Sequence, residues 1–387
     1  MYSFDKKVNR INTNSIKWDL QSHQYGKDNL LPFGIADSDY ESPKEVTKAL
    51  LDRIKQGVFG YTFVSEEYRE TVCKWHKRRY KYDISKDMII TVPKVLNGIA
   101  TAIRQFTAEN DDIIISPPVY PPFSNLIINN NRNLVPNRLI NKDEVYTIDF
   151  NDLETHFKNG AKMYILCNPH NPVGRVFNKA EISKIINLCI KYDVFLVSDE
   201  IHCDLILEGH EFYSVGNFFG VYDKIIVCTA PSKTFNMAGL RCANIIIKNE
   251  KIRDEFLGYI ENHSLKGANL LALTAAEAAY KCDYWVDAQS KHLLNNFNYA
   301  KDYLNKYAPR VKFANPEATY LIWLNFQFLG LKSVELIKEL ADFGIALNSG
   351  CDYCNDYDGY LRMNIACPID QLKEGLKRIV NYLDSKK

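Results

Sequence analysis

The sequence predicts an α/β protein with a large, doubly wound, mostly parallel sheet, followed by a smaller α+β domain. Short β-branched runs alternate with helix-like runs through the middle of the 387-residue chain, as in sheets whose strands are joined by helices. These strand-like runs lack apolar–polar alternation, so both of their faces are expected to be buried. A chain of this length also has room for two domains.

The larger domain is predicted over residues 47–285, where strand-like and helix-like runs alternate. Its expected strands are 88–92, 112–116, 163–168, 194–200, 224–229 and 243–249. Helices are expected near 95–107 and over 179–192. Each of these runs is apolar and bounded by polar or turn-forming residues, which sets its limits.

The smaller domain is predicted over residues 286–387, because the pattern changes there. Its expected helices are 285–307, 333–343 and 368–385, and its expected strands are 310–314, 319–325, 345–348 and 361–366. The N-terminal segment, residues 1–46, is too short and irregular to fold alone. We expect it to pack on the smaller domain.

Charge and hydropathy argue against several classes of partner. The chain has 48 Lys and Arg against 47 Asp and Glu, a net charge of +1, whereas nucleic acids and membrane surfaces attract a basic excess. No apolar run approaches the ~20 residues of a membrane span, and the first residues lack the apolar core of a signal peptide. We therefore expect a cytoplasmic protein without nucleic-acid or membrane partners.

The ten cysteines do not indicate a disulfide framework, because such frameworks belong to small secreted domains. Four of them lie in or beside apolar strand-like runs and are interpreted as buried thiols of a reducing compartment: Cys167, Cys203, Cys228 and Cys242. Cys351 and Cys354 form one C-x-x-C pair without the second pair typical of a zinc site. No metal site is predicted.

Four polar segments each follow a strand-like run, where ligands bind in open α/β sheets. They are Asn-Pro-rich 168–174, 198–202 with Asp199, 232–236 with Lys233, and Arg241. Taken singly, they have ordinary explanations as a rigid turn or a solvated loop lysine. Taken together, they supply an amine, a buried carboxylate, an amide and an anion-binding arginine, which is the set that pyridoxal phosphate needs. Dinucleotide, Walker-type, serine-hydrolase and zinc-protease motifs are absent.

The chain resembles the fold-type I pyridoxal-phosphate enzymes of the class I/II aminotransferase family, and within it the MalY/PatB branch of cystathionine β-lyases. The resemblance covers nearly the whole sequence. Its motifs are LLPFGIADSDY (30–40), GVFGYT (57–62), SPPVYPPF (116–123), NPHNPVG (168–174), SDEIHCD (198–204), APSKTFNMAGLR (230–241) and YLRMNIACP (360–368). SDEIH and SKTFN together are specific to the branch, whereas the lysine and NPxG mark only the superfamily.

The resemblance implies roles for the residues around the cofactor ring. Lys233 would bond the cofactor's aldehyde and shuttle protons, and Asp199 would pair with the ring nitrogen. Asn171 would donate to the phenolic oxygen, beside His202, which stands where transaminases of the family usually carry Tyr. Tyr120 would stack on the ring. Read without the resemblance, His202 and Tyr120 are also ordinary packed side chains.

The resemblance also implies a phosphate site and a substrate site. The backbone amides of Val95 and Leu96, with Ser232, Arg241 and Tyr61 of a second subunit, would hold the phosphate, so the active unit would be a homodimer. The alternative for Tyr61 is a buried tyrosine within its own chain.

Arg362 would bind the substrate's α-carboxylate, and the backbone at Ala36 would cover the substrate. Further lining is expected within 35–40, 317–320 and 347–354.

In two places the chain departs from the family pattern. Ala230 stands where many relatives have a phosphate-binding Ser or Thr, for which Arg241 or Thr229 would compensate. Residues 93–97 are also less glycine-rich than the usual phosphate cradle, where Lys94 would add charge.

Three functions follow from this resemblance. The preferred one is a pyridoxal-phosphate-dependent β-lyase that cleaves cystathionine or a related cysteine S-conjugate to a thiol, pyruvate and ammonia. The alternative is an aminotransferase acting on an L-amino acid, which a tyrosine at position 202 would have favoured. A catalytically idle regulator is the third. It is disfavoured because the lysine is intact. Regulators built on this fold also carry an N-terminal DNA-binding helix-turn-helix, and we expect the roughly thirty residues before the first motif to be too few for one.

Overall fold

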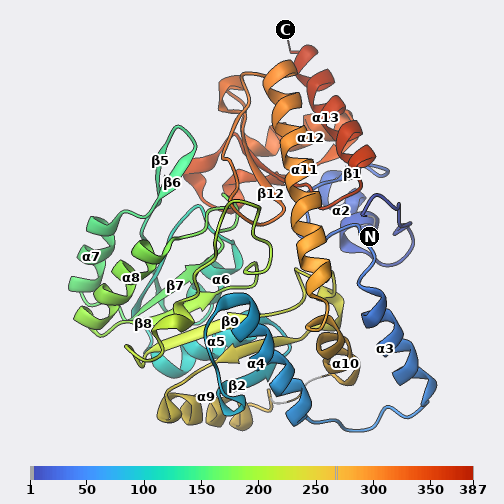
Figure 1. The fold of residues 1–387 in the computed structure, drawn as a ribbon. Helices are drawn as coiled ribbons and strands as arrows, with labels where there is room; N and C mark the ends of the chain where they lie inside the picture. Colours follow the sequence, from blue (N-terminus) through green and yellow to red (C-terminus); the bar gives the residue numbers. More distant parts are fainter. Residues whose placement is uncertain (1–3, 266, 268, 387) are drawn as a thin grey trace.

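A seven-stranded sheet organises the chain, as the computed structural model shows for the residues it describes, 4–265, 267 and 269–386 (Figure 1). Across the sheet the strands are β2 (Ile89–Val92), β10 (Ala243–Ile246), β9 (Ile225–Thr229), β8 (Phe195–Asp199), β7 (Met163–Cys167), β3 (Asp112–Ile115) and β4 (Asn133–Pro136). Strands β9, β8, β7, β3 and β4 run parallel, and β10 is antiparallel to both of its neighbours. The predicted mostly parallel α/β sheet is confirmed.

Both faces of this sheet are buried, and β7 shows how. Met163, Ile165 and Cys167 belong to one hydrophobic cluster, whereas Tyr164 and Leu166 belong to the other. Successive side chains of a strand point to opposite faces, so an uninterrupted apolar run supplies both clusters at once. This is the physical reason why the strands lack apolar–polar alternation.

Helices cover each face of the sheet. The cluster with Met163 takes side chains from α5 (Val95–Phe106), α6 (Pro122–Ile128) and α9 (Glu250–Asn262). The other cluster takes them from α3 (Lys44–Lys55), α4 (Glu66–Tyr80), α7 (Phe150–Lys158), α8 (Lys179–Tyr192) and α10 (Leu270–Ala279). The capping box between Asn178 and Glu181 satisfies backbone groups at the start of α8.

The C-terminal part has its own four-stranded antiparallel sheet. Its strands in order are β11 (Lys312–Phe313), β12 (Leu321–Asn325), β15 (Tyr360–Asn364) and β14 (Asn348–Ser349). Its helices are α11 (Asp283–Tyr307), α12 (Ser333–Asp342) and α13 (Ile369–Asp384). Figure 1 shows the long α11 running from the large sheet up to α12 and α13.

Four strands were not expected from the sequence, namely β1 (Leu31–Pro32), β4 of the large sheet, β5 (Ile140–Lys142) and β6 (Val145–Thr147), and one expected strand is divided. A hairpin of β5 and β6 stands apart from the large sheet. The single strand predicted over 345–348 is wrong, because the chain changes sheets at Leu347. Before it, β13 (Ile345–Ala346) pairs with β1, and after it β14 pairs with β15.

The N-terminal segment contains α1 (Ile16–Asp19), α2 (Gln21–Tyr25) and β1, and β1 pairs in parallel with β13 of the C-terminal part. The exact domain limits, 1–46, 47–285 and 286–387, remain a prediction. Among the helices that the structure describes, none is long and apolar enough to cross a membrane.

Candidate active site

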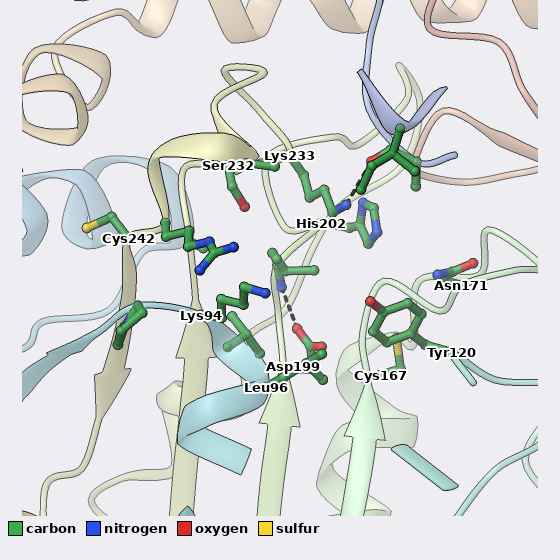
Figure 2. Close-up of a pocket in the computed structure, with 18 residues that line it drawn as sticks. Lys94, Leu96, Tyr120, Cys167, Asn171, Asp199, His202, Ser232, Lys233 and Cys242 are labelled. Carbon is green, nitrogen blue, oxygen red and sulfur yellow. Dashed lines mark hydrogen bonds between the residues drawn. The ribbon is translucent and has the colours of Figure 1, made fainter. Parts of the chain in front are cut away.

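A cavity of about 380 Å³ lies beyond the carboxyl ends of the parallel strands. Most of the predicted site residues line it: Ala36, Val95, Leu96, Tyr120, Asn171, Asp199, His202, Ser232, Lys233 and Arg241. Figure 2 shows the labelled members gathered above the strand arrowheads. Arg362 and Tyr61 lie outside this lining.

Strand register brings the polar segments together. Asp199, the last residue of β8, lies level with Cys167 at the end of β7 and with Cys228 in β9. The segments that follow these strands therefore begin at one edge of the sheet, although they are about thirty residues apart in sequence. Parallel strands place all their carboxyl ends at the same edge of the sheet. Polar segments that follow such strands in the sequence therefore indicate a common site.

Asp199 is an acid buried without a matching cation. Its side chain is 4% exposed and accepts one hydrogen bond of 3.0 Å from the Ile201 backbone N–H. Burial raises the pKa of Asp199 to about 7, and the positive charge of Lys233 opposes this shift only partly. No ion pair with Asp199 occurs within the described part of the chain, so the carboxylate suits a cationic ligand atom.

Lys233 carries an amine that is easily deprotonated. Burial, assisted by the charge of Arg362, lowers the pKa of Lys233 to about 8. The amine donates a 2.7 Å hydrogen bond to the carbonyl oxygen of Ala36, and the Tyr320 hydroxyl donates to the same oxygen at 2.9 Å. Figure 2 shows the Lys233 amine beside His202, toward the middle of the cavity.

His202 and Tyr120 present uncharged rings to the cavity. Burial lowers the pKa of His202 well below its usual range, so the imidazole is neutral, and its Nδ1 has no hydrogen-bond partner among the described residues. Its ring meets that of Tyr320 edge-on, with centroids 5.9 Å apart. Burial raises the pKa of Tyr120 to about 12, so this phenol also stays neutral.

The first turn of α5 lines one edge of the cavity. The N-cap residue, Lys94, makes no side-chain cap, so the N–H groups of Val95 and Leu96 can bind a ligand instead. Ser232 and Arg241 line the same cavity. The buried Thr229 hydroxyl has no partner in the described structure, and Ala230 supplies no hydroxyl.

Arg362 does not line the cavity itself, but it contacts Asn171, which does. It is 3% exposed and donates to Asn171 Oδ1 at 3.1 Å and to the Gly34 carbonyl oxygen at 2.7 Å. Its guanidinium also lies over the Tyr353 ring, 5.2 Å from the centroid. Its Nε has no hydrogen-bond partner among the described residues, and each Nη donates only one of its two N–H groups in these bonds, so three donors remain for a carboxylate.

The structure does not bring Tyr61 to its own chain's cavity. Tyr61 is fully exposed and belongs to a depression beside Arg69 and Lys86. The alternative of a buried tyrosine within its own chain is therefore wrong for the single chain. Val58, Phe59 and Phe63 around it are exposed as well.

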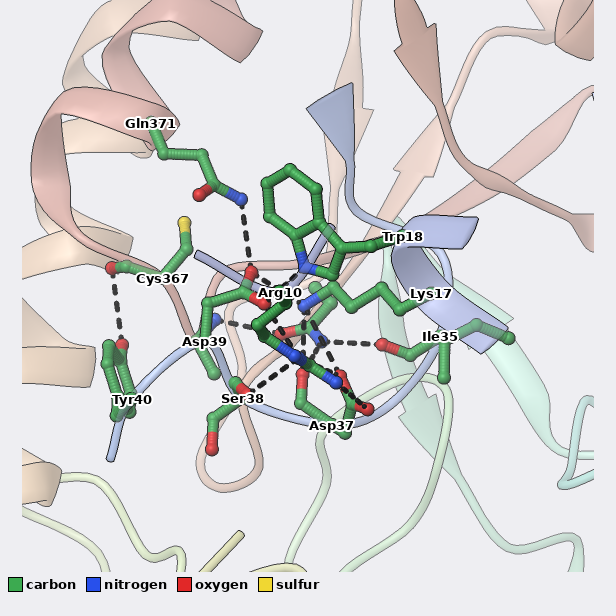
Figure 3. A network of polar contacts seen from close by, with 12 residues as sticks. Arg10, Lys17, Trp18, Ile35, Asp37, Ser38, Asp39, Tyr40, Cys367 and Gln371 are labelled. Atoms are coloured by element: carbon green, nitrogen blue, oxygen red, sulfur yellow. Dashed lines mark hydrogen bonds and ion pairs between the residues drawn. The ribbon is translucent and has the colours of Figure 1, made fainter. Parts of the chain in front are cut away.

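A buried ionic network holds the segment that carries Ala36 (Figure 3). The carboxylate of Asp39, 2% exposed, accepts from Arg10 at 2.8 Å and from the buried Lys17 at 2.9 Å. Trp18 and Gln371 donate to it as well. Lys17 and Arg10 also contact Asp37. Residues 10–18 therefore fix the backbone next to Ala36, and Gln371 connects it to α13.

Several lining residues had no signal in the sequence. Ile16 reaches the cavity from α1, and no local pattern shows where an N-terminal segment folds back. Cys167 and Cys242 also line the cavity, but in the sequence they look like any other buried thiol. Tyr320, from a stretch expected near the substrate, reaches the site by sharing the Ala36 carbonyl with Lys233.

Comparison with known proteins gives a consistent result along the chain. Residues 28–379 match the family described as "Aminotransferase class I and II". Cystathionine beta-lyase PatB of Bacillus subtilis (strain 168) is 38% identical over 383 residues, which cover 97% of this chain and 98% of PatB.

Two solved structures have nearly the same fold. Cystalysin from Treponema denticola, which contains a pyridoxal 5'-phosphate cofactor, superposes with a TM-score of 0.96 at 37% identity, covering 100% of both chains. The PLP-bound C–S lyase from Staphylococcus hominis gives a TM-score of 0.93 at 31% identity, covering 99% of this chain and 98% of that one.

We expect the Asp39→Ala variant to lose about 3–5 kcal/mol of unfolding free energy, because it leaves the buried Lys17 amine without its main counter-charge. Urea unfolding measures this loss. Glu211→Ala is the matched control, since it breaks the exposed pair with Lys81 and should have little effect. Equal losses in the two variants would contradict the assigned importance of the network.

In the chain freed of bound small molecules, we expect Lys233 to react with an amine-directed acylating reagent with half-maximal rate near pH 8, as its lowered pKa implies. Mass spectrometry of the Lys233 peptide across pH measures this midpoint. Arg362→Gln should raise the midpoint because it removes a repelling charge, and Asp199→Asn should lower it because it removes an attracting one. A midpoint near the ordinary lysine value of about 10.4 would refute the assignment.

Proposed function

Because this chain belongs to the class I and II aminotransferase family, we propose that it is a pyridoxal-phosphate-dependent carbon–sulfur β-lyase. Its reaction joins a cysteine S-conjugate with water and releases a thiol, pyruvate and ammonia, and cystathionine or a related conjugate is the substrate. The observation that carries the proposal is the meeting of Lys233 and Asp199 at one sheet edge, in a chain whose relatives are named for this activity. All ten cysteines are free, which supports a reducing, cytoplasmic location.

The residues present fit pyridoxal phosphate. Asp199 is a buried acid suited to a protonated ring nitrogen, and Lys233 is an amine suited to an aldehyde. The N–H groups that open α5, with Ser232 and Arg241, suit the phosphate. The unpartnered, buried hydroxyl of Thr229 lies next to the cavity residue Ala230, which supports Thr229 as compensation for the hydroxyl missing at position 230.

When bound, pyridoxal phosphate supplies an aldehyde that joins amines and a ring that accepts electrons from the substrate's α-carbon. Lys233 removes the α-proton, because its lowered pKa leaves part of the amine neutral near neutral pH. Asp199, in its ionised form, holds a proton on the ring nitrogen by hydrogen bonding and charge. His202 and Tyr120 remain neutral and shape the cavity without competing for that proton.

Arg362, from β15 of the C-terminal part, would orient the substrate, and Asn171, which follows β7 of the large sheet, would orient the cofactor. Because Arg362 Nη1 bonds Asn171 Oδ1, the groups that these two side chains bind lie next to each other. Arg362 offers its unpartnered Nε to the substrate's α-carboxylate. Asn171 donates its amide N–H to the phenolic oxygen of the cofactor.

The test is a product assay with purified protein. We expect pyruvate and thiol to appear from cystathionine, cystine or alkyl-cysteines without any added keto acid. Asp199→Asn should keep some cofactor and lose at least about tenfold in rate, or ~1.4 kcal/mol of barrier, because an amide cannot hold the ring proton. Turnover only when a keto acid is added would favour the aminotransferase alternative, and a smaller loss in Asp199→Asn would contradict that residue's role.

The proposed active unit is a homodimer in which Tyr61 serves the neighbouring subunit's phosphate. Tyr61 is fully exposed in the single chain, together with Val58, Phe59 and Phe63. A contiguous apolar surface of this kind favours a protein interface. The resemblance supplies the second argument, since it assigns the tyrosine of GVFGYT to the partner's site.

We expect Tyr61→Phe to raise the dissociation constant of pyridoxal phosphate about tenfold, through loss of one charge-assisted hydrogen bond. Mixing it with Lys233→Ala should restore activity at cofactor concentrations too low to fill Tyr61→Phe alone. Heterodimers then contain one site that lacks both groups and one site that lacks neither. Subunit exchange shown by mass spectrometry without recovery of activity would place Tyr61 outside the partner's site.

A further inference from the structure

Two motif residues with no role in the chemistry above contact each other beside the catalytic lysine. Asp204 ends the SDEIHCD segment, and Thr234 directly follows Lys233. The Thr234 hydroxyl donates a 2.9 Å hydrogen bond to Asp204 Oδ2. Thr234 is fully buried and Asp204 is 5% exposed, so water does not compete for this bond.

The Asp204 carboxylate is held from its other side by α4. Its Oδ1 accepts from the Tyr80 hydroxyl at 2.6 Å and from Trp75 Nε1 at 3.2 Å. A buried carboxylate is stable only when hydrogen bonds replace its hydration. With three donors, the orientation of Asp204 is therefore determined by the core around it.

Thr234 is held at a second point, its backbone. Trp285 Nε1 in α11 donates to the Thr234 carbonyl oxygen at 3.1 Å. Adjacent Cα atoms are about 3.8 Å apart, so constraints on both the hydroxyl and the carbonyl of Thr234 also place the Cα atom of Lys233. The far end of the Lys233 side chain is placed separately, by the Ala36 carbonyl.

The same short turn carries Asp199 at its start and Asp204 at its end. Backbone bonds from Cys203 to Glu200 and from Leu205 to His202 keep this turn compact. A connection through Thr234 therefore relates the position of Lys233 to that of Asp199. These are the two groups that must reach one bound molecule from different strands.

We propose that Asp204 is a positioning residue that, through Thr234, sets the root of the Lys233 side chain relative to Asp199. This inference rests on the proposed function and deepens it. Lys233 would join the cofactor's aldehyde with loss of one water, would be released when the substrate's amine takes its place on that carbon, and would then accept the α-proton as a free amine. Joining the aldehyde and accepting the proton both need its amine within a fraction of an ångström of the correct place.

The experiment compares Thr234→Val, which removes the hydroxyl at nearly constant volume, with Thr234→Ser, which keeps it. Cofactor is removed and then restored at saturating concentration, and visible absorbance follows formation of its bond to Lys233. We expect bond formation and kcat to fall about tenfold in Thr234→Val with KM within about twofold, and both to stay within about twofold of the original in Thr234→Ser.

Thr107→Val is the matched control for loss of a buried hydroxyl. The Thr107 hydroxyl donates to the Ile103 carbonyl at the end of α5 and accepts from Arg132, away from the cavity lining. We expect the melting temperature to fall in this variant as it does in Thr234→Val. The rate at which the cofactor bonds to Lys233 should stay unchanged. Equal slowing in both variants, or an unchanged rate in Thr234→Val, overturns the proposal.

A second variant decides the matter if Thr234→Val does not fold. Tyr80→Phe removes one donor to Asp204 and leaves Thr234 intact, so slower bond formation supports the proposal and an unchanged rate overturns it. Failure of the proposed function has a different signature. The unaltered protein would then form no absorbing bond, or Lys233→Ala would form it equally well.

Discussion

The structure depends on placing a buried acid and a partly buried amine at one cavity. Burial raises the pKa of Asp199 to about 7 and lowers that of Lys233 to about 8. Two groups that ordinarily titrate far apart are thereby brought near neutrality, where one can hold a proton and the other can move one. Burial is the largest cause of both shifts, and the charge of Arg362 adds to the lowering of the Lys233 pKa.

The sheet makes this burial possible. Strands β7, β8 and β9 lie side by side with both faces covered by helices, so their carboxyl ends form a rigid edge. Asp199 is the last residue of β8, and Lys233 lies four residues beyond the end of β9. The chain leaves each strand at this edge, and the polar side chains meet there without distorting the sheet.

The N-terminal segment closes the cavity from the other side. Within six residues, Gly34 accepts from Arg362, Ala36 accepts from Lys233 and Tyr320, and Asp39 binds Lys17 and Arg10. The backbone segment 34–39 therefore contacts Arg362, Lys233 and a buried ionic network. A disturbance at Asp39 has a short path to Lys233, because only two residues separate Ala36 from Asp39.

The sequence by itself determined the fold class, because that depends on local order. Local order also pointed to Asp199, Lys233, Arg241 and the segment with Asn171, whereas the other predicted lining residues came from the family resemblance. An apolar run followed by a polar motif marks a buried strand and its functional end, and helix 179–192 was predicted with its observed limits. Pairing between distant segments was decided only in the tertiary structure. The break at Leu347 depends on which strands β13 and β14 meet, the entry of Ile16 depends on where the N-terminal segment folds back, and Arg362 reaches Asn171 across 191 residues of sequence. No periodicity or motif spacing encodes such contacts, since they arise from packing of the whole chain.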